Sequence, residues 1–424
     1  MVEKREKFAW AMFDFANSGY TTVVLTAIYS TFFVGVIAKE LDEGTGTLLW
    51  TITIAIANGL VLFSSPLIGA ITDFSRNKKL FLLITTVSCV IFTALLYFTG
   101  PGDIPLAICL VILSSVMFFN GENIIAAFLP EISKPDDMGK LSGYGWTLGY
   151  IGGLLVLGLC LFYVNWAQAN QQTAEQFVPV TMVIVAACFA IASIPTFVWL
   201  KERGAQQIKP PNQSYASIGF SRLKDTWQHA HKYQDLFRFL ITLMIYHCGI
   251  NTVVVLAAVY AQEVMGFQTQ DTIMLILVVN ITAAIGAFVF GFVQDNFGSI
   301  NTLRITLFIW IAATILAFFT ETVGMFWVVA NLVGIALGAS QSAGRALVGM
   351  FSPPERNGEF FGLWGLATKL AAIIGPLSYG FITYITQGDH RLALLSTTLY
   401  FIIGIFLLYT INEKRGMQTA HNIE

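Results

Sequence analysis

The chain has 424 residues, of which 56% are hydrophobic and only 11% are Asp, Glu, Lys or Arg, and its mean hydropathy is +0.70. A soluble domain usually carries about 25% charged residues, so too few charges remain to cover a water-facing surface. Acidic and basic residues nearly balance at a net charge of −2, which excludes a nucleic-acid-binding protein that works through bulk positive charge. The composition is that of an integral membrane protein.

Apolar runs bounded by Gly, Pro, Asn and charge clusters predict twelve membrane-spanning helices in an all-α fold. The first run is too long for a signal peptide and precedes eleven further spans, so we expect it to be retained. The predicted spans cover residues 8–37, 47–72, 80–98, 104–128, 140–164, 177–200, 235–262, 270–294, 302–320, 324–349, 360–386 and 391–411.

Lys and Arg are distributed unevenly between the loops on the two sides. Of 23 such residues, 18 lie on the side of the termini and the central loop, whereas only Lys39 and Arg391 lie on the other side. Cytoplasmic loops carry an excess of Lys and Arg. We therefore expect both termini and the central loop to be cytoplasmic.

A polar break at 201–234 divides six spans from six. It contains a Lys-Pro-Pro run at 209–211, typical of a linker, and then Ile218, Leu223 and Trp227 on about one helical face, with basic residues around them. This pattern predicts a short helix at the membrane surface, with a solvated connector as the alternative. The predicted organisation is an N-terminal six-helix half at 1–200, a cytoplasmic linker at 201–234 and a C-terminal six-helix half at 235–424.

The two halves share sequence patterns. Pro135–Gly143 aligns with Pro354–Gly362 at an offset of 219, with Pro, an acid and two Gly in the same places. The pattern Gly-x-x-x-Asp ends the second span of each half, at Gly69–Asp73 and Gly291–Asp295, an offset of 222. Two matches at nearly one offset indicate a parallel repeat of two six-helix units.

The sequence contains no motif for ATP-driven transport or for cofactor-dependent chemistry. It has no G-x-x-x-x-G-K-[ST] segment for nucleotide binding, and its five cysteines lie in apolar runs without a Cys-x-x-Cys pair, which favours a packing role. No Asp pair or His-Glu-x-x-His segment suggests an intramembrane hydrolase. We expect no metal, no cofactor and no enzyme activity.

Gly291-x-x-x-Asp295-x-x-Gly298 resembles the loop signature of the major facilitator superfamily. The N-terminal copy departs from it, since Arg76 replaces the second glycine and Phe74 stands where a basic residue is usual. The resemblance implies the major facilitator fold, in which two six-helix halves related by a parallel pseudo-two-fold repeat rock around a central site.

Within that superfamily the chain is similar to the UMF1 group, which is related to the vacuolar effluxer Atg22. Cys248 stands where this group usually has an acidic residue, so a role carried by that acid is lost or changed. The resemblance implies a secondary transporter, with amino acids as the substrate class of the eukaryotic relatives, and the short tails resemble bacterial members, which places the chain in a bacterial inner membrane. The similarity rests on Trp10–Ser18, Leu129–Ile132, Gly145–Gly153, Gly249–Thr252, Arg345, Pro353–Pro354, Glu359–Gly362 and Lys369–Pro376.

Charged residues inside the predicted spans are candidate functional residues, because a lone charge in the bilayer core costs several kcal/mol. The acids Asp14 and Glu122 lie in the N-terminal half, and the bases Arg345 and Lys369 lie in the C-terminal half. In one interpretation Lys369, with Arg345, binds the carboxylate of a zwitterion or organic anion, and Asp14 or Glu122 binds its amine. In the alternatives, Asp14–Arg345 or Glu122–Arg345 is an ion pair that closes the cytoplasmic gate, or Asp14 is a proton site.

Proton coupling needs a group that changes charge near the working pH, and Glu122 and His247 are the candidates. A lone His in an apolar helix is more often a packing residue, so both interpretations stay open for His247. Amides can also join helices rather than bind a ligand. The further candidates for substrate binding or coupling are Asn17, Ser18, Asn123, Trp146, Tyr150, Asn251, Gln341 and Trp364.

Gly69, Asp73, Gly291, Asp295 and Gly298 are the candidate gating residues. Each Asp ends the second span of its half, where a carboxylate can accept hydrogen bonds from a helix N-terminus or pair with an Arg. We expect Asp73 and Asp295 to stabilise the outward-facing state.

The sequence thus predicts a secondary active transporter that moves a small polar metabolite, an amino acid or a related zwitterion or organic anion, by alternating access and proton-coupled symport. One alternative is an exporter of a siderophore or drug-like molecule, and another is a non-transporting receptor or partner-binding protein. The expected partners are a small-molecule substrate, protons and the lipid bilayer, without nucleic acid, and the expected oligomeric state is a monomer.

Overall fold

The computed structural model describes residues 3–42, 45–203, 214–228, 230–267 and 269–421. Within these ranges the regular structure is helical, and twelve helices are long and apolar enough to cross a membrane. The prediction of an all-α membrane protein with twelve spans is confirmed. The Lys-Pro-Pro run at 209–211 lies outside the described residues.

The first six spans form the N-terminal half. The first of them, Lys4–Ile37, is irregular, because π-helical turns at Tyr20–Ala27 and Phe33–Ile37 interrupt its α-helical hydrogen bonding. Such turns often lie at functional sites. The α-helices of this half are α1 (Lys4–Gly19), α2 (Tyr29–Phe32), α3 (Thr45–Ser75), α4 (Lys78–Leu95), α5 (Ile104–Ala126), α6 (Leu129–Ile132), α7 (Met138–Ala169) and α8 (Ala174–Trp199).

The described part of the linker contains the α-helix α9 (Tyr215–Gln228) and a 3-10 turn at Ala230–Tyr233, and the remaining spans form the C-terminal half. The twelfth span is broken at Thr397 into two helices. The helices of this half are α10 (Gln234–Met265), α11 (Thr269–Phe297), α12 (Ser299–Phe319), α13 (Val323–Phe351), α14 (Asn357–Ile385), α15 (His390–Ser396), α16 (Thr398–Leu408) and α17 (Glu413–His421).

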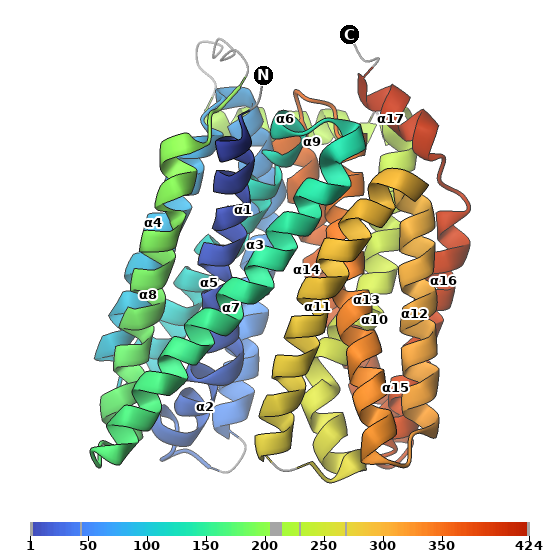
Figure 1. Ribbon diagram of the computed structural model, residues 1–424. Helices are drawn as coiled ribbons and strands as arrows, with labels where there is room; N and C mark the ends of the chain where they lie inside the picture. The colour runs from blue at the N-terminus through green and yellow to red at the C-terminus, as the bar shows by residue number, and fades with distance from the viewer. Residues whose placement is uncertain (1–2, 43–44, 204–213, 229, 268, 422–424) are drawn as a thin grey trace.

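The two halves stand side by side, and both termini lie at the same end of the bundle, which we call the terminal face (Figure 1). Near this face α7 of one half lies close to α11 of the other, and the two helices separate toward the opposite end (Figure 1). Buried aromatic rings stack inside each half. In the first, the ring of Tyr20 stacks on Phe118 at 4.9 Å between centroids, and in the second Trp310 stacks on Phe401 at 5.2 Å.

In each half, the segment that follows the last span binds the N-terminus of the third span. Glu202 accepts hydrogen bonds from the first two backbone N–H groups of α4, and Glu413 accepts them from the first two of α12, at 2.8 and 3.1 Å. These carboxylates satisfy N–H groups that have no partner within their helix. Burial raises the pKa of the Glu202 carboxyl, and its bonds to the N-terminus of α4 act in the opposite direction.

A neighbouring arginine then fastens the same segment to the first span of the half. Arg203 binds both carboxylate oxygens of Glu6 at 2.7 and 2.9 Å, and Arg415 binds both oxygens of Asp235 at 2.6 and 2.8 Å. Glu6 lies at the start of α1 and Asp235 at the start of α10. The same pair of contacts in both halves is what a parallel repeat produces.

Candidate functional site

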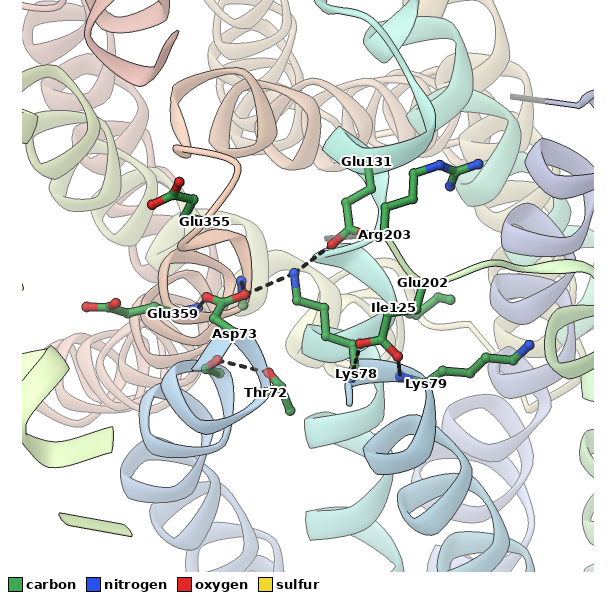
Figure 2. A network of polar contacts seen from close by, with 12 residues as sticks. Thr72, Asp73, Lys78, Lys79, Ile125, Glu131, Glu202, Arg203, Glu355 and Glu359 are labelled. Atoms are coloured by element: carbon green, nitrogen blue, oxygen red, sulfur yellow. Dashed lines mark hydrogen bonds and ion pairs between the residues drawn. The ribbon is translucent and has the colours of Figure 1, made fainter. Parts of the chain in front are cut away.

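Asp73, at the end of α3, joins the N-terminal half to the C-terminal half. Its carboxylate is fully buried and accepts hydrogen bonds from the backbone N–H groups of Gly358 and Glu359, at 2.9 and 2.8 Å, in the first turn of α14. Figure 2 shows Lys78 on its other side, with its Nζ 2.9 Å from Asp73 and 2.7 Å from Glu131. Removing one partner of such a buried pair costs about 3–5 kcal/mol.

Asp295, at the end of α11, makes the reciprocal contact from the C-terminal half. It accepts hydrogen bonds from the N–H groups of Gly139 and Lys140, at 2.9 and 3.1 Å, in the first turn of α7. The Lys140 ammonium lies 3.7 Å from the same carboxylate. Each half therefore offers the carboxylate at the end of its second span to a helix N-terminus of the other half.

Glycines allow the backbones to meet at these two contacts. A β-carbon added to Gly69 would overlap the carbonyl oxygen of Gly358, and one added to Gly291 would lie 3.0 Å from the carbonyl oxygen of Gly139. Gly298 has a different place: it has a φ of +84°, directly precedes α12 and lies beside Glu413 within its own half. Four of the five predicted gating residues thus lie at the contact between the halves, and Gly298 does not.

A second buried ion pair crosses between the halves. Arg345 on α13 donates to the carboxylate of Asp14 on α1 at 2.7 Å, and to the backbone oxygen and Oγ of Ser142 on α7 at 2.9 and 3.1 Å. Its guanidinium lies over the rings of Trp10 and Trp146, 4.7 and 5.2 Å from their centroids. Of the two ion pairs that the sequence suggested for Arg345, the structure forms the one with Asp14.

Glu122 and Lys369 form a looser arrangement. The carboxylate on α5 interacts electrostatically with the ammonium on α14, but the two are not among the ion pairs within 4.0 Å that the described residues form. The Lys369 Nζ lies 2.9 Å from the centroid of the Phe119 ring, a cation–π contact. Both side chains are partly exposed, whereas Asp14 and Arg345 are buried. Among the described residues, neither charge is therefore matched by a close ion pair.

The predicted polar and aromatic residues divide into two groups. Asn17 and Asn123 are buried, and Asn123 donates to Ser65 at 2.7 Å while packing against Gly365, so it joins α5 to α3 and α14. Ser18 donates to the Asp14 carbonyl within its own helix, at 2.6 Å. The other residues are partly exposed: Trp146, Tyr150, Asn251, Gln341 and Trp364.

His247 is buried on α10, where its ring lies 5.0 Å from the ring of Tyr246. Among the described residues, no hydrogen bond or ion pair connects it to Asp14, Glu122, Arg345 or Lys369. The structure therefore does not join His247 to these four residues, which we call the charged cluster.

Four residues at these contacts are not among the site residues that the sequence predicts. Trp10 and Glu131 lie in the segments that carry the family resemblance, and Ser142 lies in the repeated segment Pro135–Gly143, so each had a signal that could have been followed. Lys78 had none, because it looks like one of three basic residues in an ordinary loop. Only its burial at 1% exposure distinguishes it.

Gly69→Ala should weaken the closed terminal face, because the new methyl group would collide with the backbone of α14. Gly59→Ala on the same helix is the matched control, since a β-carbon there meets nothing within 4 Å. The measurement is the rate at which a water-soluble maleimide labels a cysteine placed at Thr72, which is buried beside this contact. We expect faster labelling for Gly69→Ala only; equal rates in the two variants would contradict the close-packing account.

A family model described as "Vacuole effluxer Atg22 like" matches residues 45–421 of the chain. The chain is 26% identical to an uncharacterized transporter of the major facilitator type, YxiO of Bacillus subtilis, over 98% of its own length and 97% of the relative. It is 25% identical to autophagy-related protein 22 of Yarrowia lipolytica over 73% of its own length, but spans only 57% of that longer protein.

The fold is also found among solved structures. FucP, a transporter of the major facilitator superfamily in an outward conformation, superposes with a TM-score of 0.72 at 13% identity, covering 95% of this chain and 98% of FucP. The predicted major facilitator fold is therefore confirmed. The chain belongs to the Atg22-like vacuole effluxer family and is a secondary transporter of the major facilitator superfamily, not an enzyme.

Proposed function

We propose that this protein moves a small zwitterion or organic anion, an amino acid or a related compound, across the membrane by proton-coupled alternating access. The observation that carries the proposal is the pair Glu122 and Lys369. One comes from each half, both are partly exposed, and they interact without a close ion pair. A substrate carboxylate can bind Lys369 while an amine or a proton neutralises Glu122.

In this proposal the terminal face is cytoplasmic and the structure is outward-facing. The orientation follows from the excess of Lys and Arg on that side. The conformation follows from the buried contacts of Asp73, Asp295 and the Asp14–Arg345 pair, which close this side of the bundle. The near full-length similarity to the Bacillus subtilis protein supports a bacterial cytoplasmic membrane.

The moving parts are the two halves, at residues 1–200 and 235–424, with the linker between them. To face inward, Asp73 and Asp295 must leave their helix N-termini and Arg345 must leave Asp14. Once separated, the carboxylates and the N–H groups can all bind water, so each state can satisfy its polar groups.

Electrostatics can link the substrate site to this change. Glu122 interacts not only with Lys369 but also with Asp14 and Arg345. Neutralising Glu122 removes a negative charge that competes with Asp14 for Arg345, and a bound carboxylate on Lys369 removes a positive charge. Loading the site therefore changes the field on the ion pair that closes the gate.

A small polar substrate fits this arrangement better than a large drug-like molecule. The partly exposed Glu122 and Lys369 offer charges of both signs, and the amides of Asn251 and Gln341 are partly exposed as well. A zwitterion can use both charges, whereas an apolar drug would leave them desolvated and unmatched.

Lys369→Gln should abolish uptake while leaving the protein folded, because Gln keeps much of the side-chain volume but removes the charge for a carboxylate. The control is Lys39→Gln, at an exposed position on the side of the bundle opposite the terminal face. Uptake into proteoliposomes and elution in size-exclusion chromatography are measured together. Normal uptake by a well-folded Lys369→Gln variant would remove Lys369 from the site.

Glu122→Gln should remove the pH dependence of uptake, because the amide cannot exchange a proton in the relevant range. His247→Ala should keep that dependence, since His247 lies outside the charged cluster. The measurement is the initial uptake rate with and without an imposed pH gradient. A Glu122→Gln variant that still responds to the gradient would place the proton site elsewhere.

A further inference from the structure

Helix α9 of the linker packs tightly on the N-terminal half. A β-carbon added to Gly219 would lie 2.8 Å from the side chain of Leu67 and 3.0 Å from that of Ile71, both on α3. At the start of α9 the ring of Tyr215 lies 6.5 Å from Phe74, edge to face. The inner face of α9 therefore packs on α3, the helix that carries Asp73 near its end.

The same helix is bonded to the C-terminal half at the start of α14. Arg356, one residue before α14, donates to Asp225 at 2.7 Å and to Thr226 at 2.6 Å. Arg222 donates to the backbone oxygen of Glu355 at 3.1 Å, and its Nε lies 3.8 Å from the fully buried carboxylate of Glu359. Thus α9 bridges α3 and α14, the two helices that Asp73 holds together.

The outer face of α9 has a different chemistry. Phe220 is 61% exposed and Trp227 is 76% exposed, and the exposed Lys224 lies between them at helical spacing. The helix lies at the terminal face, level with the ends of the membrane-spanning helices (Figure 1). Aromatic rings prefer the boundary between lipid tails and headgroups, and a lysine there is attracted to anionic headgroups.

We propose that α9 binds the anionic headgroups of the adjacent leaflet through Phe220, Lys224 and Trp227, and that it thereby clamps the terminal face closed. A helix held in the headgroup layer keeps its inner face on α3 and α14, and opening of this face requires α9 to release one of them. Anionic lipid therefore favours the outward-facing state. This inference uses the proposed orientation but not the proposed substrate.

The first test asks whether the outer face touches lipid. The full-length protein is placed in phosphatidylcholine nanodiscs that contain either brominated phosphatidylglycerol or the same fraction of brominated phosphatidylcholine, and tryptophan fluorescence is recorded for the wild type and Trp227→Phe. We expect the emission lost in Trp227→Phe to be quenched by both lipids, and more strongly by phosphatidylglycerol. Emission from Trp227 that neither lipid quenches would overturn the proposal and indicate a water-facing or protein-facing surface.

The second test asks whether lipid binding closes the gate. Maleimide labelling of a cysteine at Thr72 is compared in nanodiscs with and without phosphatidylglycerol. In the parent protein we expect the anionic lipid to slow labelling by about fivefold or more, the low end of typical coupling between sites. In the triple variant Phe220→Ser, Lys224→Gln, Trp227→Ser this lipid effect should disappear.

Arg356→Ala separates the clamp from the lipid contact, because it removes the bonds to Asp225 and Thr226 but leaves the outer face intact. In this variant the cysteine at position 72 should react quickly with maleimide in both lipids, and the lipids should still quench the fluorescence of Trp227. A parent protein that labels equally in both lipids, or a folded triple variant that keeps the lipid effect, would refute the proposal. Neither readout involves transport, so a failure of the proposed substrate or coupling leaves this test interpretable.

Discussion

The closed side of this transporter depends on hydrogen bonds between helix N-termini and buried carboxylates. A helix N-terminus carries N–H groups without partners in the helix, and a carboxylate at the end of another helix loses its water on burial. Asp73 and Asp295 accept hydrogen bonds from the helix N-termini of the opposite half, so the N–H groups gain an acceptor and the buried carboxylates gain donors in place of water. The halves can approach only because glycines bring the backbones into contact at Gly69 and Gly358 and at Gly291 and Gly139.

The repeat makes these contacts reciprocal, but the sequence makes them unequal. Glu359 and Lys140 occupy equivalent places in the repeated segment, so Asp73 meets a helix start that carries another acid, and Asp295 meets one that carries a base. Around Asp73 the structure adds Lys78, which also binds Glu131. The Asp73 contact is therefore a buried network beneath α9, while the Asp295 contact is simpler and nearer to solvent.

The charges between the halves differ in how completely the protein itself matches them. Arg345 uses its guanidinium on Asp14 and Ser142 and is covered by two indole rings, so its charge is matched within the protein. Among the described residues, Lys369 interacts with a more distant carboxylate, that of Glu122, and with the face of the Phe119 ring. A ligand gains most where the protein leaves a charge incompletely matched, which is why we propose Lys369 for the binding site and Arg345 for the gate.

The twelve spans and the parallel repeat could be predicted from sequence, because lipid demands long apolar helices and the Gly-x-x-x-Asp pattern appears once in each half. The division of the charges, with the acids in the N-terminal half and the bases in the C-terminal half, also suggested Asp14 or Glu122 as the ion-pair partner of Arg345. The choice of Asp14 over Glu122 as the partner of Arg345 depends on helix rotation and on Ser142, which no pattern encodes. The burial of Lys78, the bridging bonds of α9 and the place of Gly298 outside the interface likewise depend on tertiary packing.

The most direct test of the reciprocal contacts is a distance measurement across the terminal face. Spin labels at the exposed positions Lys134 and Asn301, one in each half, are compared by pulsed electron paramagnetic resonance in the parent protein and in the double variant Asp73→Asn, Asp295→Asn. An amide keeps the size of the side chain but loses the charge that binds the helix N-terminus. We expect a shift toward a longer distance in the double variant. An unchanged distance distribution would show that other contacts hold this side closed.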